Sequence, residues 1–142
     1  MFEKILLPYD GSSHAKKAVE LVKKLCAGSE SRCRVTVMYV LEPYTPPPEA
    51  AALDVDWAGV AERSGQAIVA DAVQALREQG IAADPFVAVG HPAEEIVGEA
   101  KRGGYELIVI GRRGLGLFGE IVLGSVSHKV LHLAPCPVLI AQ

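Results

Sequence analysis

The sequence has few cysteines, and their spacing excludes two common classes of small domain. Cys26, Cys33 and Cys136 are its three cysteines, and no two of them form a CxxC pair. Structural zinc sites need closely spaced cysteine or histidine ligands, and disulfide-stapled domains usually have an even number of cysteines. We therefore expect three reduced thiols, with Cys26 and Cys136 buried or nearly so. A disulfide between Cys26 and Cys33 has little support.

An excess of basic charge and a long apolar run are also missing. The 142 residues include 14 lysines and arginines against 17 aspartates and glutamates, a net charge of −3. Proteins that bind nucleic acid usually carry a basic face, so no nucleic-acid partner is expected. No apolar stretch approaches the ~18 residues of a membrane span. Residues 1–8 lack the charged region and cleavage pattern of a signal peptide, so we expect a cytoplasmic protein with no membrane contact.

Half of the residues are hydrophobic, which predicts one domain over residues 1–142 with a substantial core. Short apolar runs alternate with segments whose apolar residues recur at helical spacing. The pattern predicts strands at 2–8, 35–41, 86–89, 107–110 and 137–141, and helices at 13–27, 55–80, 92–102 and 124–133. This alternation is typical of a single-domain α/β fold, in which helices cover both faces of an open, mainly parallel five-stranded sheet.

Residues 42–54 interrupt the alternation with four prolines, at positions 43, 46, 47 and 48. Proline has a fixed φ and no amide hydrogen, which disfavours helix interiors and central strands. We therefore expect a loop or flap here, without a regular helix.

A glycine-rich pattern follows the predicted strand at 107–110. Gly111, two residues, Gly114, nine residues, then Gly124 and Ser125 lead into the last predicted helix. Glycine lets backbone N–H groups approach a ligand closely, and a helix N-terminus carries partial positive charge, so together they form a site for phosphate. The pattern predicts a bound nucleotide, at the carboxyl ends of the strands where ligands of such sheets bind.

Two other nucleotide motifs fit this stretch poorly. Residues 114–119 spell GxGxxG, but a dinucleotide site needs an acidic residue about 20 positions later. No Asp or Glu occurs after Ile121. The chain also has no glycine–lysine pair followed by serine or threonine, so a Walker-type phosphate loop is excluded.

Five segments can be considered together, two of which contain glycines of this pattern: Ile5–Ser12, Gly90–Ile96, Leu107–Gly111, Leu123–Ser127 and Ala134–Leu139. Together they resemble the universal stress protein family, in its ATP-binding subgroup, over nearly the whole chain. The resemblance implies a Rossmann-like fold of the adenine nucleotide alpha hydrolase type, with strand order 3-2-1-4-5. It also implies a nucleotide-binding regulatory protein of the stress response that binds ATP, with Mg²⁺ or Mn²⁺ on the phosphates.

The resemblance also implies roles for individual residues. Asp10 would accept hydrogen bonds from the ribose hydroxyls, which suits an ionised carboxylate, and Val40 would meet the adenine mainly through backbone groups. The glycines would let the backbone approach the phosphates, and the serines would lie beside them. The expected nucleotide-binding residues are Pro8, Asp10, Val40, Gly111, Arg113, Gly114, Gly124, Ser125, Val126 and Ser127.

Simpler interpretations stay open for several of these residues. Asp10 can act as a turn or cap aspartate, and Val40 can be a core residue with or without a ligand. Ser125 can be the N-cap of the last helix, a role compatible with a phosphate contact. Arg112 and Arg113 either strengthen phosphate binding or face solvent.

No pattern in the sequence identifies a catalyst. A hydrolase or transferase needs a positioned base or nucleophile with an orienting partner, and no second catalytic carboxylate accompanies Asp10. His128 and His132 are spaced to share a helix face but lack a third ligand, so no protein metal site is expected. We favour a nucleotide-binding module. The alternatives are a slow ATPase or phosphotransferase at the same site, and a nucleotide-independent dimeric interaction protein.

The apolar segment 137–141 is expected at an edge of the sheet. Unpaired backbone groups on an exposed edge strand invite pairing with another chain. The family resemblance implies a homodimer made by antiparallel pairing of these strands, so self-association is expected.

Overall fold

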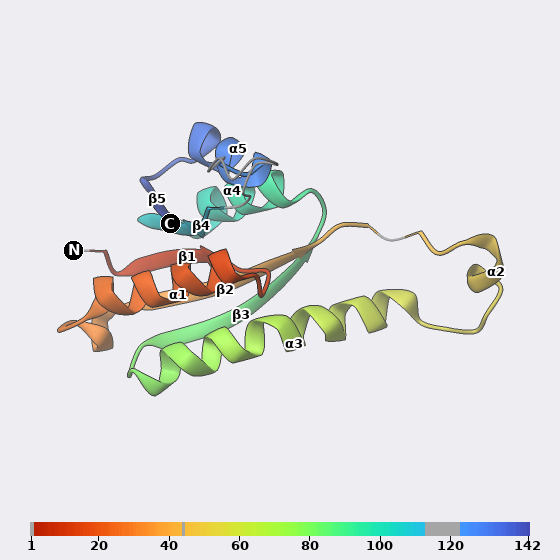
Figure 1. The fold of residues 1–142 in the computed structure, drawn as a ribbon, viewed down its shortest axis with the longest axis horizontal. Coiled ribbons are helices and arrows are strands. Elements are labelled where there is room, and N and C mark those ends of the chain that lie inside the picture. Colours follow the sequence, from red (N-terminus) through yellow and green to blue (C-terminus); the bar gives the residue numbers. More distant parts are fainter. Residues whose placement is uncertain (1, 44, 113–122) are drawn as a thin grey trace.

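The fold is a five-stranded parallel sheet between two layers of helices (Figure 1). The computed structural model describes residues 2–43, 45–112 and 123–142. Its strands are β1 (Lys4–Pro8), β2 (Arg34–Leu41), β3 (Ala82–Val89), β4 (Leu107–Gly111) and β5 (Val138–Ala141). They lie in the order β3-β2-β1-β4-β5, and every neighbouring pair is parallel. The predicted fold class and strand order are confirmed.

Two hydrophobic cores lie on opposite faces of this sheet. Helices α1 (Ser13–Cys26) and α3 (Trp57–Glu78) cover one face, and α4 (Pro92–Gly103) and α5 (Ser125–Leu133) cover the other. Successive side chains of a strand point to opposite faces. Ile5 and Leu7 accordingly join the core under α1 and α3, while Leu6 joins the core under α4. All three side chains are fully buried, so β1 forms the centre of both cores.

Strand β3 begins at Ala82, earlier than the predicted start at Phe86, and it contains Pro85. The predicted start was therefore wrong by four residues. At this edge of the sheet β3 pairs only with β2. The N–H of Gly90 donates to Leu41, and backbone groups alternate in direction along a strand. The nitrogen of Pro85 therefore faces outward, where its missing hydrogen costs no bond in the sheet.

The segment 42–54 contains a one-turn helix, α2 (Pro48–Ala51), so the expectation of no regular helix was wrong. Pro48 occupies the first helical position, where the amide hydrogen has no partner within a helix and a fixed φ is favourable. The 3₁₀ helix η1 (Glu30–Arg32) is the other short element.

An arm projects from this sandwich beyond the end of the sheet, as Figure 1 shows for α2 and the first turns of α3. We define the arm as residues 45–62. Burial of α3 on the body begins only at Gly65, where an added Cβ would lie 2.9 Å from a Val87 side-chain atom. The first turns of α3 therefore extend past the core that holds the rest of that helix.

All three cysteines are free thiols, as predicted. Cys26 and Cys33 are buried and Cys136 is half-buried. Burial, followed by a hydrogen bond with Cys33, raises the pKa of the Cys26 thiol to about 12. Cys26 is therefore an unreactive core thiol at neutral pH. Within residues 2–43, 45–112 and 123–142, no helix combines the length and apolarity needed to cross a membrane.

Candidate nucleotide site

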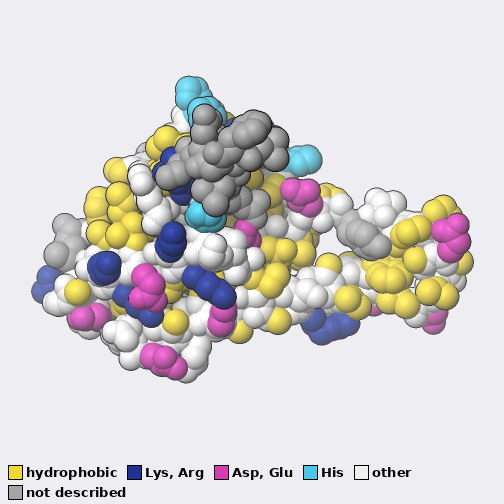
Figure 2. Space-filling view, viewed as in Figure 1, with side chains coloured by type: hydrophobic (Ala, Val, Ile, Leu, Met, Phe, Trp, Pro, Cys, Tyr) yellow, Lys and Arg dark blue, Asp and Glu magenta, His cyan; other side chains and the backbone are white. Residues whose placement is uncertain are grey.

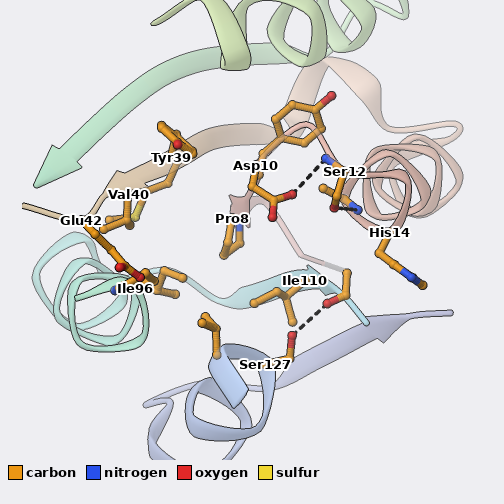
Figure 3. Close-up of a pocket in the computed structure, with 16 residues that line it drawn as sticks. Pro8, Asp10, Ser12, His14, Tyr39, Val40, Glu42, Ile96, Ile110 and Ser127 are labelled. Atoms are coloured by element: carbon orange, nitrogen blue, oxygen red, sulfur yellow. Dashed lines mark hydrogen bonds between the residues drawn. The ribbon is translucent and has the colours of Figure 1, made fainter. Parts of the chain in front are cut away.

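A cavity of about 400 Å³ opens at the carboxyl ends of β1, β2 and β4 (Figure 3). This is the point between β1 and β4 where the strand order reverses, the position at which open parallel sheets bind ligands. Residues from three strands, from α1, α4 and α5 and from the turns that join them surround it. The described lining residues are Pro8, Tyr9, Asp10, Ser12, His14, Ala15, Met38, Tyr39, Val40, Glu42, Pro92, Ile96, Ile110, Gly111, Val126 and Ser127.

The turn between β1 and α1 holds a carboxylate at the cavity. Asp10 Oδ1 accepts a hydrogen bond from the Ser12 N–H at 3.0 Å, and Ser12 Oγ accepts one from the Ala15 N–H at 3.1 Å, which caps α1. Gly11 between them has a φ of +80°, a conformation that glycine adopts without steric cost. The interpretation of Asp10 as a turn residue is confirmed. A carboxylate has about four lone-pair sites, so this bond is compatible with a ligand contact.

The end of β4 is fixed to the first turns of two helices. A Cβ atom on Gly111 would lie 2.5 Å from the carbonyl oxygen of His14 in α1, so only glycine fits there. The Ser127 hydroxyl of α5 donates a hydrogen bond of 2.9 Å to the Gly111 carbonyl, and Ser127 is buried. Gly111 was predicted for its approach to phosphate. The structure adds a different requirement, the close passage of the α1 backbone.

Six of the ten sequence-predicted residues line the cavity: Pro8, Asp10, Val40, Gly111, Val126 and Ser127. Gly124 and Ser125 lie at the start of α5 but are not among the described lining residues. The N-cap of α5 is Gly124, which has an extended backbone, so the N-cap interpretation of Ser125 was wrong. Helical geometry begins at Ser125, one residue later than the cap. Arg113 and Gly114 lie outside the described residues.

Several lining residues were missed by the sequence predictions. Met38 and Glu42 lie two residues before and after Val40, and alternation along β2 places all three on one face. That period could have identified them. Ile96 gave no such signal, because it reaches the cavity from α4 through tertiary packing. The Nδ1 atom of His14 is buried and has no hydrogen-bond partner within the described residues.

The described lining has acidic and apolar groups but no lysine or arginine. Asp10 and Glu42 supply carboxylates, and Val40, Ile96 and Ile110 supply apolar walls. Figure 3 shows Val40 and Glu42 beside Ile96, with Asp10 across the cavity. Hydrogen-bond acceptors beside apolar walls suit a sugar and a base better than an anionic group.

Tyr9 supports the cavity from beneath. Its ring is buried under α3, and its hydroxyl donates a hydrogen bond of 3.2 Å to Asp71 Oδ2. Burial, followed by the negative charge and hydrogen bond of Asp71, raises the pKa of Tyr9 to about 12. Tyr9 is therefore a neutral hydrogen-bond donor across the physiological pH range and holds β1 against α3.

Comparisons with known proteins agree over the full length of the chain. The universal stress protein family model matches residues 1–142. The universal stress protein YxiE of Bacillus subtilis is 33% identical over 156 aligned residues, which cover all of both chains. The universal stress protein in the QAH/OAS sulfhydrylase 3'region of Thermus aquaticus is 36% identical over 143 residues, again covering all of both chains.

Solved structures share the fold. Hypothetical protein MJ0577 aligns with a TM-score of 0.81 and 26% identity, over 99% of this chain and 96% of that one. An Arabidopsis thaliana universal stress protein family member with AMP bound aligns with a TM-score of 0.73 and 21% identity, over 97% and 90%. A universal stress protein in complex with cAMP gives 0.75 and 22%, over 99% and 97%. The cavity at the strand ends, the strand order and these full-length matches lead to one assignment: the chain belongs to the universal stress protein family.

Proposed function

We propose that this protein is an ATP-binding regulatory protein of the stress response. The observation that carries the proposal is the cavity where β1, β2 and β4 end, which combines the Asp10 carboxylate with apolar walls. The AMP and cAMP complexes of proteins with the same fold support an adenine nucleotide as the ligand. So does the dAMP complex of an Archaeoglobus fulgidus universal stress protein.

In this proposal the nucleoside occupies the described part of the cavity. The adenine packs against Val40 and Ile96, and the ribose hydroxyls donate to Asp10, beside Pro8. The phosphates extend past Gly111 toward the start of α5, where Gly124, Ser125, Val126 and Ser127 lie. Arg113 and Gly114 complete the phosphate end. A helix N-terminus favours negative charge, which supports this orientation.

Mg²⁺ or Mn²⁺ would supply positive charge beside the phosphates. The described residues contain no group of three or more His, Cys, Asp or Glu side chains that could hold a metal ion. Mg²⁺ usually keeps several waters and binds through one or two carboxylates together with substrate phosphates. Asp10 fits that single-carboxylate role, so the ion would enter with the nucleotide.

We propose that the protein binds ATP without hydrolysing it rapidly. Mass spectrometry of the bound nucleotide and calorimetric titration test this. We expect mass spectrometry to find an adenine nucleotide released from the denatured purified protein. Calorimetric titration with ATP and Mg²⁺ should give one saturable site. Absence of both, at ATP concentrations up to about millimolar, contradicts the proposal. Steady phosphate release that disappears in a folded Asp10→Asn variant would instead support the slow-ATPase alternative.

We also propose a homodimer through β5, the second edge of the sheet. The carbonyls of Pro137 and Ala141 accept hydrogen bonds from Ile108 in β4 and from Arg112, which follows β4. The backbone groups of Val138 and Ile140 therefore face outward. An outward N–H and C=O row is a template for antiparallel pairing with a second copy.

Replacing Val138 with proline is expected to weaken this dimer, because proline removes one outward N–H without touching the bonds to β4. Sedimentation velocity should show a larger monomer fraction than in the wild type. Val138→Ala is the control, since it shortens the same side chain and keeps the outward N–H of the edge backbone. A wild-type protein that stays monomeric at micromolar concentration argues against the dimer.

A further inference from the structure

The arm exposes apolar side chains that nothing in the described chain covers. Leu53 is 59% exposed, and Val55 and Val60 are each 41% exposed. Leu53 and Val55 precede α3, and Val60 lies in its first turns, nine residues before the buried Val69 and therefore on the opposite side of the helix. Figure 2 shows the arm as a lobe with much apolar surface, set apart from the body. Contiguous apolar surface of this kind is typical of an interaction site.

The arm itself is acidic, and Arg63, the next residue of α3, places a guanidinium nitrogen 3.3 Å from where a Cβ of Gly59 would lie. The four ionisable side chains of the arm are Glu49, Asp54, Asp56 and Glu62, and residues 45–62 contain no lysine, arginine or histidine. Asp56 caps α3 by accepting a hydrogen bond from the Gly59 N–H. The other three carboxylates are on exposed residues. A partner for the arm would therefore present apolar surface rimmed by positive charge.

Such a surface lies along α1, in a groove of about 820 Å³ between α1, α3 and β5. Lys16, Lys17 and Lys24 rim the groove, and Leu21 and Leu139 supply apolar surface in it. The three lysines are exposed and form no ion pair within the described residues. Figure 2 shows several basic side chains, with acidic ones between them, on the body in the same view as the arm.

The carboxylates of the groove already have partners. Glu20 pairs with Lys23 at 2.8 Å, and Asp71 accepts the hydrogen bond of the Tyr9 hydroxyl. Lys23 compensates Glu20, whereas Asp71 keeps its negative charge because the Tyr9 hydroxyl is neutral; the three lysines outnumber that carboxylate, so the described lining is net positive. Three ammonium groups around apolar residues complement three carboxylates around Leu53 and Val55.

We propose that the arm of one copy docks in the lysine-rimmed groove of a second copy. Within one chain the arm projects away from α1 (Figure 1), so it does not fill its own groove. The two complementary surfaces belong to the same sequence, which favours a second copy over an unrelated acidic protein. The contact uses side chains of the arm, α1 and β5 (Leu139), whereas edge pairing uses the backbone groups of β5. It does not depend on a bound nucleotide.

Charge reversal in two matched variants tests this contact. One variant reverses the arm (Glu49→Lys, Asp54→Lys and Glu62→Lys), and the other reverses the groove (Lys16→Glu, Lys17→Glu and Lys24→Glu). Each variant alone sets like charges against each other, so each should self-associate at least about tenfold more weakly than the wild type at low salt. In an equimolar mixture, the basic arm of the first variant meets the acidic groove of the second, and the acidic arm of the second meets the basic groove of the first. The mixture should therefore recover wild-type association.

The measurement is sedimentation equilibrium at about 50 mM and about 500 mM salt, with circular dichroism to establish that each variant is folded. Wild-type association through this contact should weaken at high salt, whereas pairing of β5 should persist. The control variant carries Lys101→Glu, Arg102→Glu and Lys129→Glu on exposed positions of α4 and α5. It makes the same change of net charge as the groove variant and should associate as the wild type does.

Three results would overturn the proposal. The first is a wild-type chain whose association does not respond to salt. The second is a pair of folded reversal variants that associate as tightly as the control. The third is a mixture no more associated than its components, which would leave the groove to an acidic partner other than a second copy.

Discussion

Replacing Gly111 with alanine is expected to lower the free energy of unfolding by about 3 kcal/mol, near the upper end of typical overpacking costs. The new Cβ would lie 2.5 Å from the carbonyl oxygen and 2.6 Å from the carbonyl carbon of His14, and 2.9 Å from the nitrogen of Ala15. All three are backbone atoms, so no side-chain rotation relieves the overlap. Either β4 or the start of α1 has to move, and movement of β4 also strains the hydrogen bond from Ser127.

Urea denaturation of the wild type and the Gly111→Ala variant measures this effect. Gly98→Ala in α4 is the matched control, because its Cβ would meet only the flexible end of Arg102, with the nearest atom at 3.1 Å. Alanine is favoured over glycine inside a helix by up to about 1 kcal/mol, so the control should be neutral or slightly stabilising. A Gly111→Ala protein as stable as the control would show that α1 moves aside without cost.

Replacing Asp10 with asparagine is expected to weaken ATP binding about 30-fold while the fold survives. The asparagine carbonyl still accepts the hydrogen bond from the Ser12 N–H, so the turn into α1 is retained. What is lost is the negative charge, and hydrogen bonds to charged groups contribute about 1.5–3 kcal/mol. Calorimetric titration of both proteins with ATP and Mg²⁺ gives the ratio of dissociation constants.

Titration with 2′-deoxy-ATP separates a ribose contact from an indirect effect of Asp10. If the carboxylate accepts from the 2′-hydroxyl, the wild type should prefer ATP, and Asp10→Asn should reduce that preference. An equal loss of affinity for both nucleotides would argue against the contact with the 2′-hydroxyl and leave Asp10 its proposed role beside Mg²⁺. Unchanged affinity for both would remove Asp10 from the site, and would leave the proposal of nucleotide binding to be decided by the wild-type titration.

The place of the cavity could be predicted from the sequence because it follows from local patterns, whereas the strand order was implied by the resemblance to the universal stress protein family. The apolar runs at β1 and β4 and the helical periodicity between them indicate a parallel sheet, and such a sheet has its ligand position at the strand ends. Gly111 is the last residue of β4, and Asp10 lies two residues after the end of β1. Their convergence at the cavity required no knowledge of side-chain packing.

The features that could not be predicted depend on contacts between distant segments. The passage of α1 over Gly111 and the reach of Ile96 into the cavity are set by how helices pack on the sheet. Local rules for proline also fail where the surroundings reduce the energetic cost of a proline residue. Pro85 is tolerated because β3 is an edge strand, and Pro48 is tolerated because it begins a helix.

The position of Pro85 makes the two edges of the sheet unequal. Its nitrogen faces outward from β3 without a hydrogen to donate, and the neighbouring Asp84 is exposed. Proline and charge on an edge strand oppose the addition of another strand. The sheet can thus be extended past β5 but is terminated at β3. The proposed pair through β5 would therefore be closed, because neither copy would keep a second edge for fibrous, amyloid-like growth.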